Sequence, residues 1–593
     1  MKSIIAETNR WSSQKRLVGA LLCCVLGLSI VLAEEESDMP SLVARFNKFY
    51  QTKQFSKAAP IAEKILQIKE QTLGPDNRGT AVAANNLAEV YRYMGQYAKA
   101  EPLYQRALTI FEKELGLEHP DVASVLNNVA LLYSETGEYA KAESIYQRVL
   151  KIREAAFGPD NPETAESLNA LGALYYYMGQ YAKAEPLYQR ALKIREKAFG
   201  PNNPKTAYTL NDLGALYVAQ DDYAKAEKLF QRALKIREKS LGADHPDTAV
   251  TMQNLAATYR DMGQYKKAEQ LFQRALAVTE KTSGPDHPNT AWIVNNIGTV
   301  YHAMGKYSEA ESYFQRALKI REKMLGPDHP DTGSTLSALA LDYQDMHEYA
   351  KAESLYQRAL AISEKVHGPE SAAAAGNLHE LALLYFYQKD YAKSEPLYQK
   401  ALAISEKASG PDSTDTAATL ASLGALYDHT GQFAKAEPLE LRALRIYEKA
   451  VGPEHPLTAT AAGNLGRLYC DKGEFAKAEP LELRALKIEE KKLGPDHLDT
   501  AKTLDNLGDL YFETGQYAKA EPLYQRALKT REKILGPEHS SVAETLDDLA
   551  ALYWAKGQSA KAEPVSQRAA GIRANLKQNR PAETPRKSAS DSL

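Results

Sequence analysis

Apolar and small residues recur with helical spacing along most of this chain. Leu168, Leu171, Gly172 and Tyr175 follow the spacing i, i+3, i+4 and i+7, which places side chains on one face of an amphipathic helix. A second stripe of the same kind runs over residues 181–197. The pattern therefore predicts two helices joined by a short turn, a helical hairpin whose members we call helix A and helix B.

The same two stripes return every 42 residues without insertion or deletion. A fixed period of this length predicts a solenoid, in which each unit buries its apolar face against its neighbours. Counting back one step from Gly95 reaches Lys53, so thirteen copies are present, and we expect an all-α solenoid over residues 41–578. The residues at the turn between helices A and B are Gly95, Gly137, Gly179, Asp221, Gly263, Gly305, His347, Lys389, Gly431, Gly473, Gly515 and Gly557.

Small residues and loop residues suggest how the units pack. The position of Gly172 is always Ala or Gly, so we expect helix B to approach closely there, with Ala184 opposite Gly172. The loop before helix A has the form Gly-Pro-Asp-His-Pro, in which we expect Asp or Thr to cap helix A and Pro to fix the approach of the chain.

The order Leu-Gly, a Tyr three residues further on and an Ala twelve residues after the Gly resembles the tetratricopeptide repeat signature. The usual unit has 34 residues, and the longer unit here is similar to that of kinesin light chain. The segments that carry this likeness are 126–130 (Leu-Asn-Asn-Val-Ala) and 184–187 (Ala-Glu-Pro-Leu). The resemblance implies a right-handed superhelical solenoid of about 13 repeats whose A helices line a concave groove.

Within that groove, the resemblance places ligand contacts just before the second leucine of helix A. Six of the twelve residues there are asparagines, whose amides both donate and accept hydrogen bonds and so could hold the backbone of an extended peptide. Alternatively, each asparagine bonds a polar group of a neighbouring helix. The six are Asn86, Asn128, Asn254, Asn296, Asn464 and Asn506.

Aromatic residues add a second set of candidate contacts on helix A. They are common anchors for a bound partner because they bury a large area at low entropic cost, although contact between adjacent repeats is the alternative for each one. Towards the C-terminus the same faces become acidic, with Asp428, Asp471, Asp505, Asp509, Glu513, Asp547 and Asp548 against Arg467 and Lys502. This gradient favours a partner with a basic segment. The aromatic candidates are Tyr176, Tyr177, Tyr208, Trp292, Phe386 and Tyr387.

Two repeats carry a glutamate where the others place an aromatic residue on helix B. Glu440 and Glu482 stand at the position of Tyr104 and Phe230. Because an unpaired buried carboxylate is costly, we expect both side chains to reach the surface or to pair. They mark either a looser segment, a contact site on the convex face, or a helix edge at which the next leucine covers the gap.

The N-terminus has the order of a secretory signal. Lys15 and Arg16 precede an uncharged run over residues 17–33, and three glutamates follow. This order predicts cleavage after Ala33 and export of the repeats to the periplasm or the extracellular space. An uncleaved membrane anchor is the alternative. We expect residues 34–40 to link this segment to the repeats and residues 579–593 to form a disordered tail.

Composition narrows the function further. A net charge of −3 makes nucleic acid an unsuitable partner. Most histidines occur once per repeat in the loop before helix A and are not gathered as a metal site requires. No nucleophile motif or phosphate-binding loop stands out, so we expect no enzymatic activity and no cofactor.

These observations predict a non-enzymatic scaffold that binds an extended peptide or a partner protein in its concave groove. The alternative is a structural subunit of an envelope assembly, anchored by residues 17–33, that uses its convex face and its ends.

Overall fold

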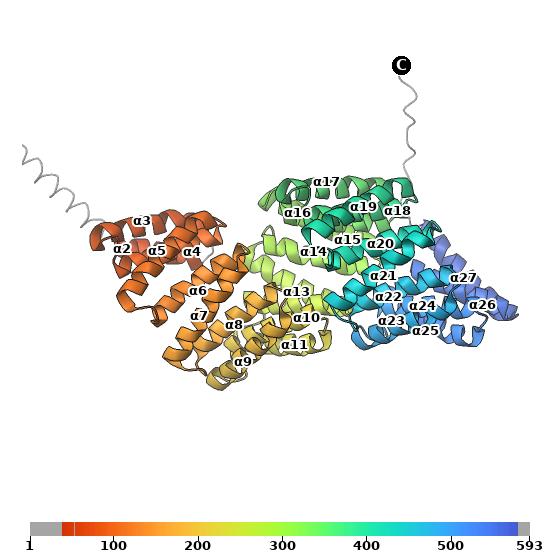
Figure 1. Cartoon of the computed structure of the whole chain (residues 1–593), viewed down its shortest axis with the longest axis horizontal. Helices are drawn as coiled ribbons and strands as arrows, with labels where there is room; N and C mark the ends of the chain where they lie inside the picture. Colours follow the sequence, from red (N-terminus) through yellow and green to blue (C-terminus); the bar gives the residue numbers. More distant parts are fainter. Residues whose placement is uncertain (1–37, 52–53, 579–593) are drawn as a thin grey trace, which may run out of the picture. The chain divides into compact units, whose positions relative to one another are not determined.

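A computed structural model describes residues 38–51 and 54–578, and helices and short connections account for all of them (Figure 1). The predicted signal segment and C-terminal tail lie outside the described residues. The helices alternate between a shorter A helix and a longer B helix, so the predicted all-α solenoid of thirteen hairpins is confirmed. The A helices are α2 (Met39–Gln51), α4 (Arg78–Tyr93), α6 (Pro120–Glu135), α8 (Pro162–Tyr177), α10 (Pro204–Ala219), α12 (Pro246–Asp261), α14 (Pro288–Ala303), α16 (Pro330–Asp345), α18 (Ala372–Tyr387), α20 (Thr414–His429), α22 (Pro456–Asp471), α24 (Leu498–Glu513) and α26 (Ser540–Ala555). The B helices are α3 (Phe55–Leu73), α5 (Tyr97–Leu115), α7 (Tyr139–Phe157), α9 (Tyr181–Phe199), α11 (Tyr223–Ser240), α13 (Tyr265–Ser283), α15 (Tyr307–Met324), α17 (Tyr349–His367), α19 (Tyr391–Ala408), α21 (Phe433–Ala450), α23 (Phe475–Lys492), α25 (Tyr517–Leu535) and α27 (Ser559–Gln578).

The hairpins group into two units, residues 1–216 and 217–593, and the boundary falls within α10. Each unit is described by itself below. No helix in the described part of the chain combines the length and apolar character needed to cross a bilayer.

The loop histidines begin the A helices. His245 has the extended backbone of an N-cap, and its Nδ1 accepts the backbone N–H of Asp247 at 3.1 Å. His119, His287, His329, His455, His497 and His539 cap their helices in the same way. The expectation that Asp or Thr would cap helix A is therefore wrong in these repeats. The threonine stabilises the loop instead, because the hydroxyl of Thr248 donates a hydrogen bond to the carbonyl of Gly242.

The turn between helices A and B requires a left-handed residue. Gly95 has φ +70°, and the chain reverses there with the N–H of Gln96 donating to the carbonyl of Tyr91. Asp221, His347 and Lys389 adopt positive φ angles of 54°, 62° and 62° at the same position. The shared turn is confirmed, with strain at the three residues that have a Cβ atom.

Within a hairpin, the small residue of helix A faces an aromatic ring of helix B. A Cβ added to Gly172 would lie 3.0 Å from Cε1 of Tyr188, and one added to Gly508 would lie 2.6 Å from Cε1 of Tyr524. The expected partner of Gly172, Ala184, is thus wrong. The missing side chain accommodates the buried ring, which is the largest group in the repeat core.

Two recurring polar contacts join each repeat to the next. A helix A tyrosine donates its hydroxyl to a glutamate of the preceding helix B, as Tyr175 does to Glu143 at 2.6 Å. A buried helix B arginine donates to the first turn of the next helix A, as Arg237 does to the Asp247 carbonyl and to the Thr251 hydroxyl, both at 2.7 Å. Bonds to a charged donor are among the stronger hydrogen bonds. These contacts therefore fix the angle between repeats.

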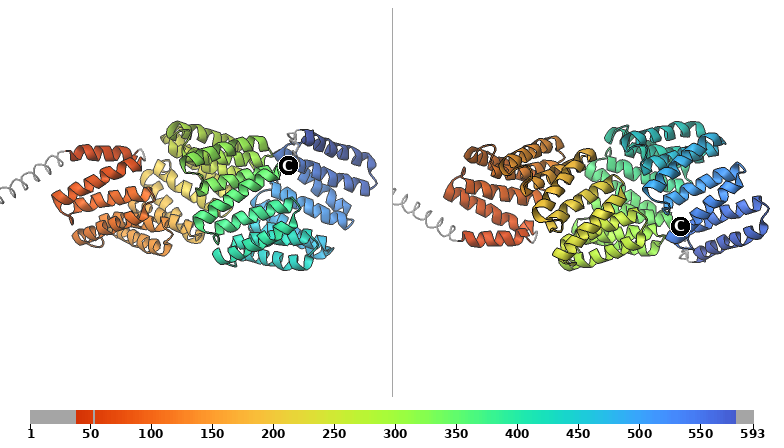
Figure 2. Two further views of the ribbon diagram at one scale, coloured as in Figure 1. Left: turned by 90° about the horizontal axis from the view of Figure 1, so that it is seen from above. Right: turned by 90° about the horizontal axis from the view of Figure 1, so that it is seen from below.

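Curvature follows from unequal spacing of the two helix layers. Helix A of one repeat contacts helix A of the next, as α20 does with α22, and no two successive B helices among those described make comparable contact. The closer layer lies on the inner side of the curve, so the A helices form the concave side. Figure 2 shows how successive hairpins rotate relative to one another within the second unit.

In the second unit, loop histidines contact turns of much earlier repeats. Nε2 of His455 pairs with the carboxylate of Asp221, and the rings of His497 and His539 lie against Gly263 and Gly305. These three contacts follow one another at the 42-residue step of the chain. Repeats far apart in sequence are therefore in direct contact within this unit.

Substitution at Gly305 tests this contact. A Cβ added there would lie 2.5 Å from the His539 ring, whereas one added to Gly431 would have nothing within 4 Å. The φ angles, +69° and +71°, make the backbone strain of the two substitutions alike. We expect Gly305→Ala to lower the free energy of unfolding by about 1–3 kcal/mol more than Gly431→Ala, as overpacking does. Urea denaturation followed by circular dichroism measures the difference, and equal midpoints for the two variants would contradict the contact.

Candidate functional site

The predicted asparagines do not form one uniform ladder. In the first unit Asn128 donates from Nδ2 to Asn85 at 3.1 Å, and in the second unit Asn296 is buried between the Trp292 carbonyl and Arg260. These two amides therefore bond neighbouring groups, the structural alternative. Asn464 and Asn506 instead line pockets of the second unit. Asn86 and Asn254 are half-buried on helix A and line neither of those pockets.

The predicted aromatics are divided between the two units. In the first unit Tyr177 is 70% exposed beside Tyr176, with ring centroids 5.5 Å apart, and Tyr208 is also exposed. In the second unit Trp292 packs edge-on against Phe272. Phe386 and the exposed Tyr387 line a pocket, which makes them the aromatic candidates whose surroundings are best suited to binding.

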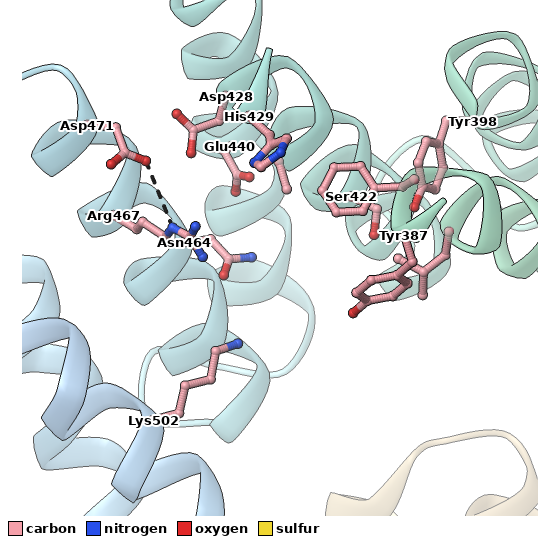
Figure 3. Close-up of a pocket in the computed structure, with 13 residues that line it drawn as sticks. Tyr387, Tyr398, Ser422, Asp428, His429, Glu440, Asn464, Arg467, Asp471 and Lys502 are labelled. Atoms are coloured by element: carbon pink, nitrogen blue, oxygen red, sulfur yellow. Dashed lines mark ion pairs between the residues drawn. The ribbon is translucent and has the colours of Figure 1, made fainter. Parts of the chain in front are cut away.

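That pocket, which we call the aromatic pocket, lies along α18 to α24 and encloses about 320 Å³. Figure 3 shows Tyr387 at one side, Asp428 and His429 of α20 above Glu440 of α21, and Arg467 and Asp471 on α22. The His429 ring packs on Phe386 with centroids 5.5 Å apart. The pocket thus offers aromatic faces at one end and charged groups of both signs at the other.

A second pocket, which we call the acid pocket, continues along α22 to α26 and encloses about 670 Å³. It shares Arg467 and Asp471 with the aromatic pocket. One arginine faces five carboxyl side chains here, and the remaining lining is largely apolar and aromatic. The lining comprises Arg467, Cys470, Asp471, Phe475, Glu482, Asn506, Asp509, Leu510, Phe512, Glu513, Tyr524, Asp548 and Ala551.

Glu440 and Glu482 line these pockets and are buried, so the expectation that they reach the surface or pair is wrong. Their exposed fractions are 2% and 0%, and Oε2 of Glu440 and both carboxylate oxygens of Glu482 have no hydrogen-bond partner. Each carboxyl group takes the place of the aromatic ring over a helix A glycine, since a Cβ at Gly424 or Gly466 would touch it. They therefore face the concave side, not the convex side.

Burial raises the pKa of both groups. Desolvation, together with the charge of Asp428, raises the pKa of Glu440 to about 8. Desolvation and the charge of Glu489 raise the pKa of Glu482 to about 8, and the nearby amide of Asn506 and charge of Lys502 offset this only in part. The pKa of Asp548 rises to about 7 through burial and the charges of Asp509 and Asp505. At neutral pH the floor of each pocket therefore holds a protonated carboxyl group.

The described residues contain no group of three or more His, Cys, Asp or Glu side chains arranged to hold a metal ion. The arrangement of aromatic faces, carboxyl groups and amides on the inner helices is suited to holding a partner's side chains.

Comparison with known families agrees with this architecture. A family model described as Tetratricopeptide repeat matches residues 49–113, 121–197, 171–239, 205–281, 254–323, 295–365, 331–383, 372–449, 441–491, 459–533 and 499–575. The chain belongs to the tetratricopeptide repeat family. The predicted family is therefore confirmed, and its members are typically interaction scaffolds.

Several solved structures are similar to this chain. A kinesin light chain of Podosopora anserina with nearly identical TPR-like repeats is 25% identical, over 35% of this chain and 97% of that chain, with a TM-score of 0.32. BtubC (BKLC) from P. vanneervenii is 27% identical, over 43% and 98%, with a TM-score of 0.33. A Rap protein complexed with competence and sporulation factor is 15% identical, over 70% and 99%, with a TM-score of 0.43. No curated protein matches the chain.

Sequence reasoning missed where the two glutamates point and the arginine contacts between repeats. The sequence did carry a signal for the glutamates. Each one replaces an aromatic residue of helix B, while the helix A residue that faces it, Gly424 or Gly466, is still a glycine. The arginine contact also had a signal, since Arg195, Arg237 and Arg321 recur in step with Thr209, Thr251 and Thr335 fourteen residues later.

Proposed function

We propose that this chain is a non-enzymatic scaffold that binds an extended segment of a partner protein along the A helices of its second unit. The partner lies over α18 to α26, in the aromatic pocket and the acid pocket. The observation that carries the proposal is the continuity of these pockets through Arg467 and Asp471 on the inner helix layer.

The lining suggests the character of the partner segment. Phe386 and Tyr387 offer faces for an apolar or aromatic side chain, because rings bury a large area in a preformed pocket. The carboxyl groups that follow along α22 to α26 favour a basic segment next to it. The Asn464 amide lines the aromatic pocket and the Asn506 amide lines the acid pocket, where each could hold the partner's backbone.

Site-specific photocrosslinking tests this function. A benzoylphenylalanine is placed at Tyr387 or at Phe512, which line the two pockets, and as a control at Leu483, an exposed residue of helix B. We expect the same partner to be captured from extracts of the native host at both pocket positions and not at Leu483. Mass spectrometry should assign the two crosslinks to one contiguous segment of that partner. Capture from Leu483 alone would move the interface to the outer surface and overturn the proposal.

We also propose that residues 1–33 direct export, so that the repeats act outside the cytosol. The support is the order of the basic, apolar and acidic residues around the run 17–33. N-terminal sequencing of the protein purified from its native host tests this. A chain that starts at Glu34 agrees with a cleaved signal, and one that keeps residues 17–33 indicates the membrane-anchored alternative.

A further inference from the structure

The acid pocket lacks an aromatic ring that most other repeats have at the equivalent place. In the next repeat the ring of Tyr524 fills the space over Gly508. At the equivalent place Glu482 replaces the ring while the facing glycine, Gly466, is kept. A smaller carboxyl group therefore lies where an aromatic ring packs in the next repeat.

The rest of the described chain compensates the remaining carboxyl group only weakly, through the nearby amide of Asn506 and the charge of Lys502. Glu482 is completely buried, and neither of its carboxylate oxygens has a hydrogen-bond partner, although both oxygens belong to a residue that lines the pocket. A buried carboxyl group without partners is unfavourable for the isolated fold. Its retention at the floor of an open pocket points to a partner from outside the chain.

The charged groups around Glu482 indicate which charge that partner carries. The pocket wall carries Asp509, Glu513 and Asp548 in addition to Asp471, and its one arginine, Arg467, already lies 3.9 Å from Asp471. An anion would meet mainly repulsion there. A cation would supply the Glu482 carboxyl group with the partner that its two oxygens lack.

The aromatic residues of the pocket wall indicate a second property of the partner. Phe475, Phe512 and Tyr524 contribute aromatic surface to the same pocket. Aromatic faces attract guanidinium and ammonium groups and also cover the apolar stem of a long side chain. A hydrated metal ion uses no such surface, so the pocket suits an organic cation on an aliphatic chain.

We propose that the acid pocket receives the arginine or lysine side chain of the partner segment, with the Glu482 carboxylate as its counter-ion at the floor. This inference rests on the proposed function and names the residue that the second unit recognises. Glu440 in the aromatic pocket is a less suitable site, because three carboxyl side chains line that pocket together with two cations, Arg467 and Lys502, whereas five carboxyl side chains line the acid pocket with Arg467 alone.

Binding is then linked to proton release. Burial raises the pKa of Glu482 to about 8, so the free protein holds it protonated at pH 7, and a bound cation favours the ionised form. We expect release of about one proton per bound side chain at pH 7 and tighter binding at higher pH. The ionisable groups that face Glu482 from the packed helices are Arg467, Cys470 and Asp471 on α22, Glu489 on its own helix α23, Lys502, Asp509 and Glu513 on α24, Tyr524 on α25 and Asp548 on α26.

Peptide binding to the full chain tests the proposal directly. The probes are a fluorescein-labelled hexa-arginine peptide and its hexa-citrulline counterpart, which keeps the shape of the side chain without the charge, and anisotropy is read at constant ionic strength. We expect the arginine peptide to bind at least about tenfold more tightly than the citrulline peptide. Equal binding of the two peptides, or no binding of hexa-arginine, would overturn the proposal.

Variants separate the pocket from the general acidic field. Glu482→Tyr restores the ring found in the other repeats, so it should fold and yet weaken hexa-arginine binding at least about tenfold. Glu544→Gln removes one exposed charge near the pocket and should change the affinity less than about twofold. Equal losses for the two variants would indicate diffuse attraction and reject a specific site.

Calorimetry in buffers of different ionisation enthalpy gives an independent readout. The wild-type chain should release about one proton on binding hexa-arginine at pH 7, and Glu482→Tyr should release none. Partner capture at Tyr387 that is unaffected by Glu482→Tyr would reject this inference and leave the proposed function standing. Loss of capture at all groove positions in the wild-type chain would reject the proposed function itself.

Discussion

Raising the pH from 5.5 to 8.5 is expected to destabilise the repeats that contain α20 to α26. Buried carboxyl groups cause the effect. The largest single contributions come from Glu440 and Glu482, whose pKa values are raised from 4.5 to about 8 by desolvation, and the burial of Glu489, Asp505 and Asp548, whose pKa values rise to about 7, acts in the same direction. A native state that holds protons which the unfolded chain has already released loses stability as the pH rises.

The sign follows from the order of the two pKa values. Below pH 4.5 both states are protonated and the groups have no effect. Between pH 4.5 and about 8 the unfolded chain loses the protons while the native protein retains them, so stability falls steadily through this window. One pKa unit corresponds to about 1.4 kcal/mol, and each glutamate therefore lowers the free energy of unfolding by on the order of 3–5 kcal/mol at pH 8.5.

Hydrogen exchange measured by mass spectrometry is the suitable experiment, since repeat arrays open locally and exchange resolves single hairpins. After correction for the pH dependence of intrinsic exchange, peptides from α20 to α26 should be less protected at pH 8.5 than at pH 5.5. Helices α5 and α7, where Tyr104 and Tyr146 hold the equivalent positions, serve as the internal reference. Glu440→Gln with Glu482→Gln should remove about half of the dependence, because Glu489, Asp505 and Asp548 still titrate in the same helices. Equal protection at both pH values would show that burial does not raise the pKa values of these groups.

Restoring the aromatic residue is expected to stabilise the same repeats. Glu482→Tyr and Glu440→Phe place rings over Gly466 and Gly424, as Tyr524 lies over Gly508 and Phe314 over Gly298. At pH 8.5 each substitution should raise the local free energy of unfolding by roughly 4–8 kcal/mol, because it removes the ionisation cost and buries an aromatic ring. At pH 5.5, one unit above the pKa of 4.5 in the unfolded chain, the ionisation cost is only about 1.4 kcal/mol, and the gain should fall to about 2–4 kcal/mol.

The converse substitution provides a matched control. Tyr356 is completely buried in a repeat of ordinary composition, and Tyr356→Glu would create a third buried carboxyl group. We expect it to destabilise its repeat, more at pH 8.5 than at pH 5.5. Urea denaturation and exchange at both pH values measure the two effects. Stabilisation by Tyr356→Glu, or destabilisation by Glu482→Tyr at both pH values, would contradict this account of the pockets.

Much of the architecture could be predicted from the chain because it is local and repeated. The stripe at Leu168, Leu171 and Tyr175 is averaged over thirteen copies, so no single irregularity obscures it. The turn glycine is equally readable, since only a residue tolerant of positive φ fits there, and Asp221 shows the same angle at 54°. Helix order, hairpin pairing and repeat number all follow from such short-range rules.

The candidate site was only partly predictable. Phe386, Tyr387, Asn464 and Asn506 were found by position and do line the pockets. Asn128 and Asn296 occupy the same position of their repeats but bond to neighbouring groups. The sequence position is alike in all of them, and what differs is the side chain that the adjacent repeat presents.

Periodicity alone decided the fold class, because the burial of one stripe against the next depends on spacing within a single repeat. Tertiary packing decided which of the candidate residues line a pocket. Glu482 was expected to reach the surface or to pair, but the hairpin closes over it and leaves it buried at the floor of the acid pocket, where neither carboxylate oxygen has a hydrogen-bond partner. The contact of His455 with Asp221 was likewise invisible along the chain, since it depends on the curvature summed over several repeats. The side chains at every junction between repeats set that curvature, so the contact becomes visible only in the folded second unit.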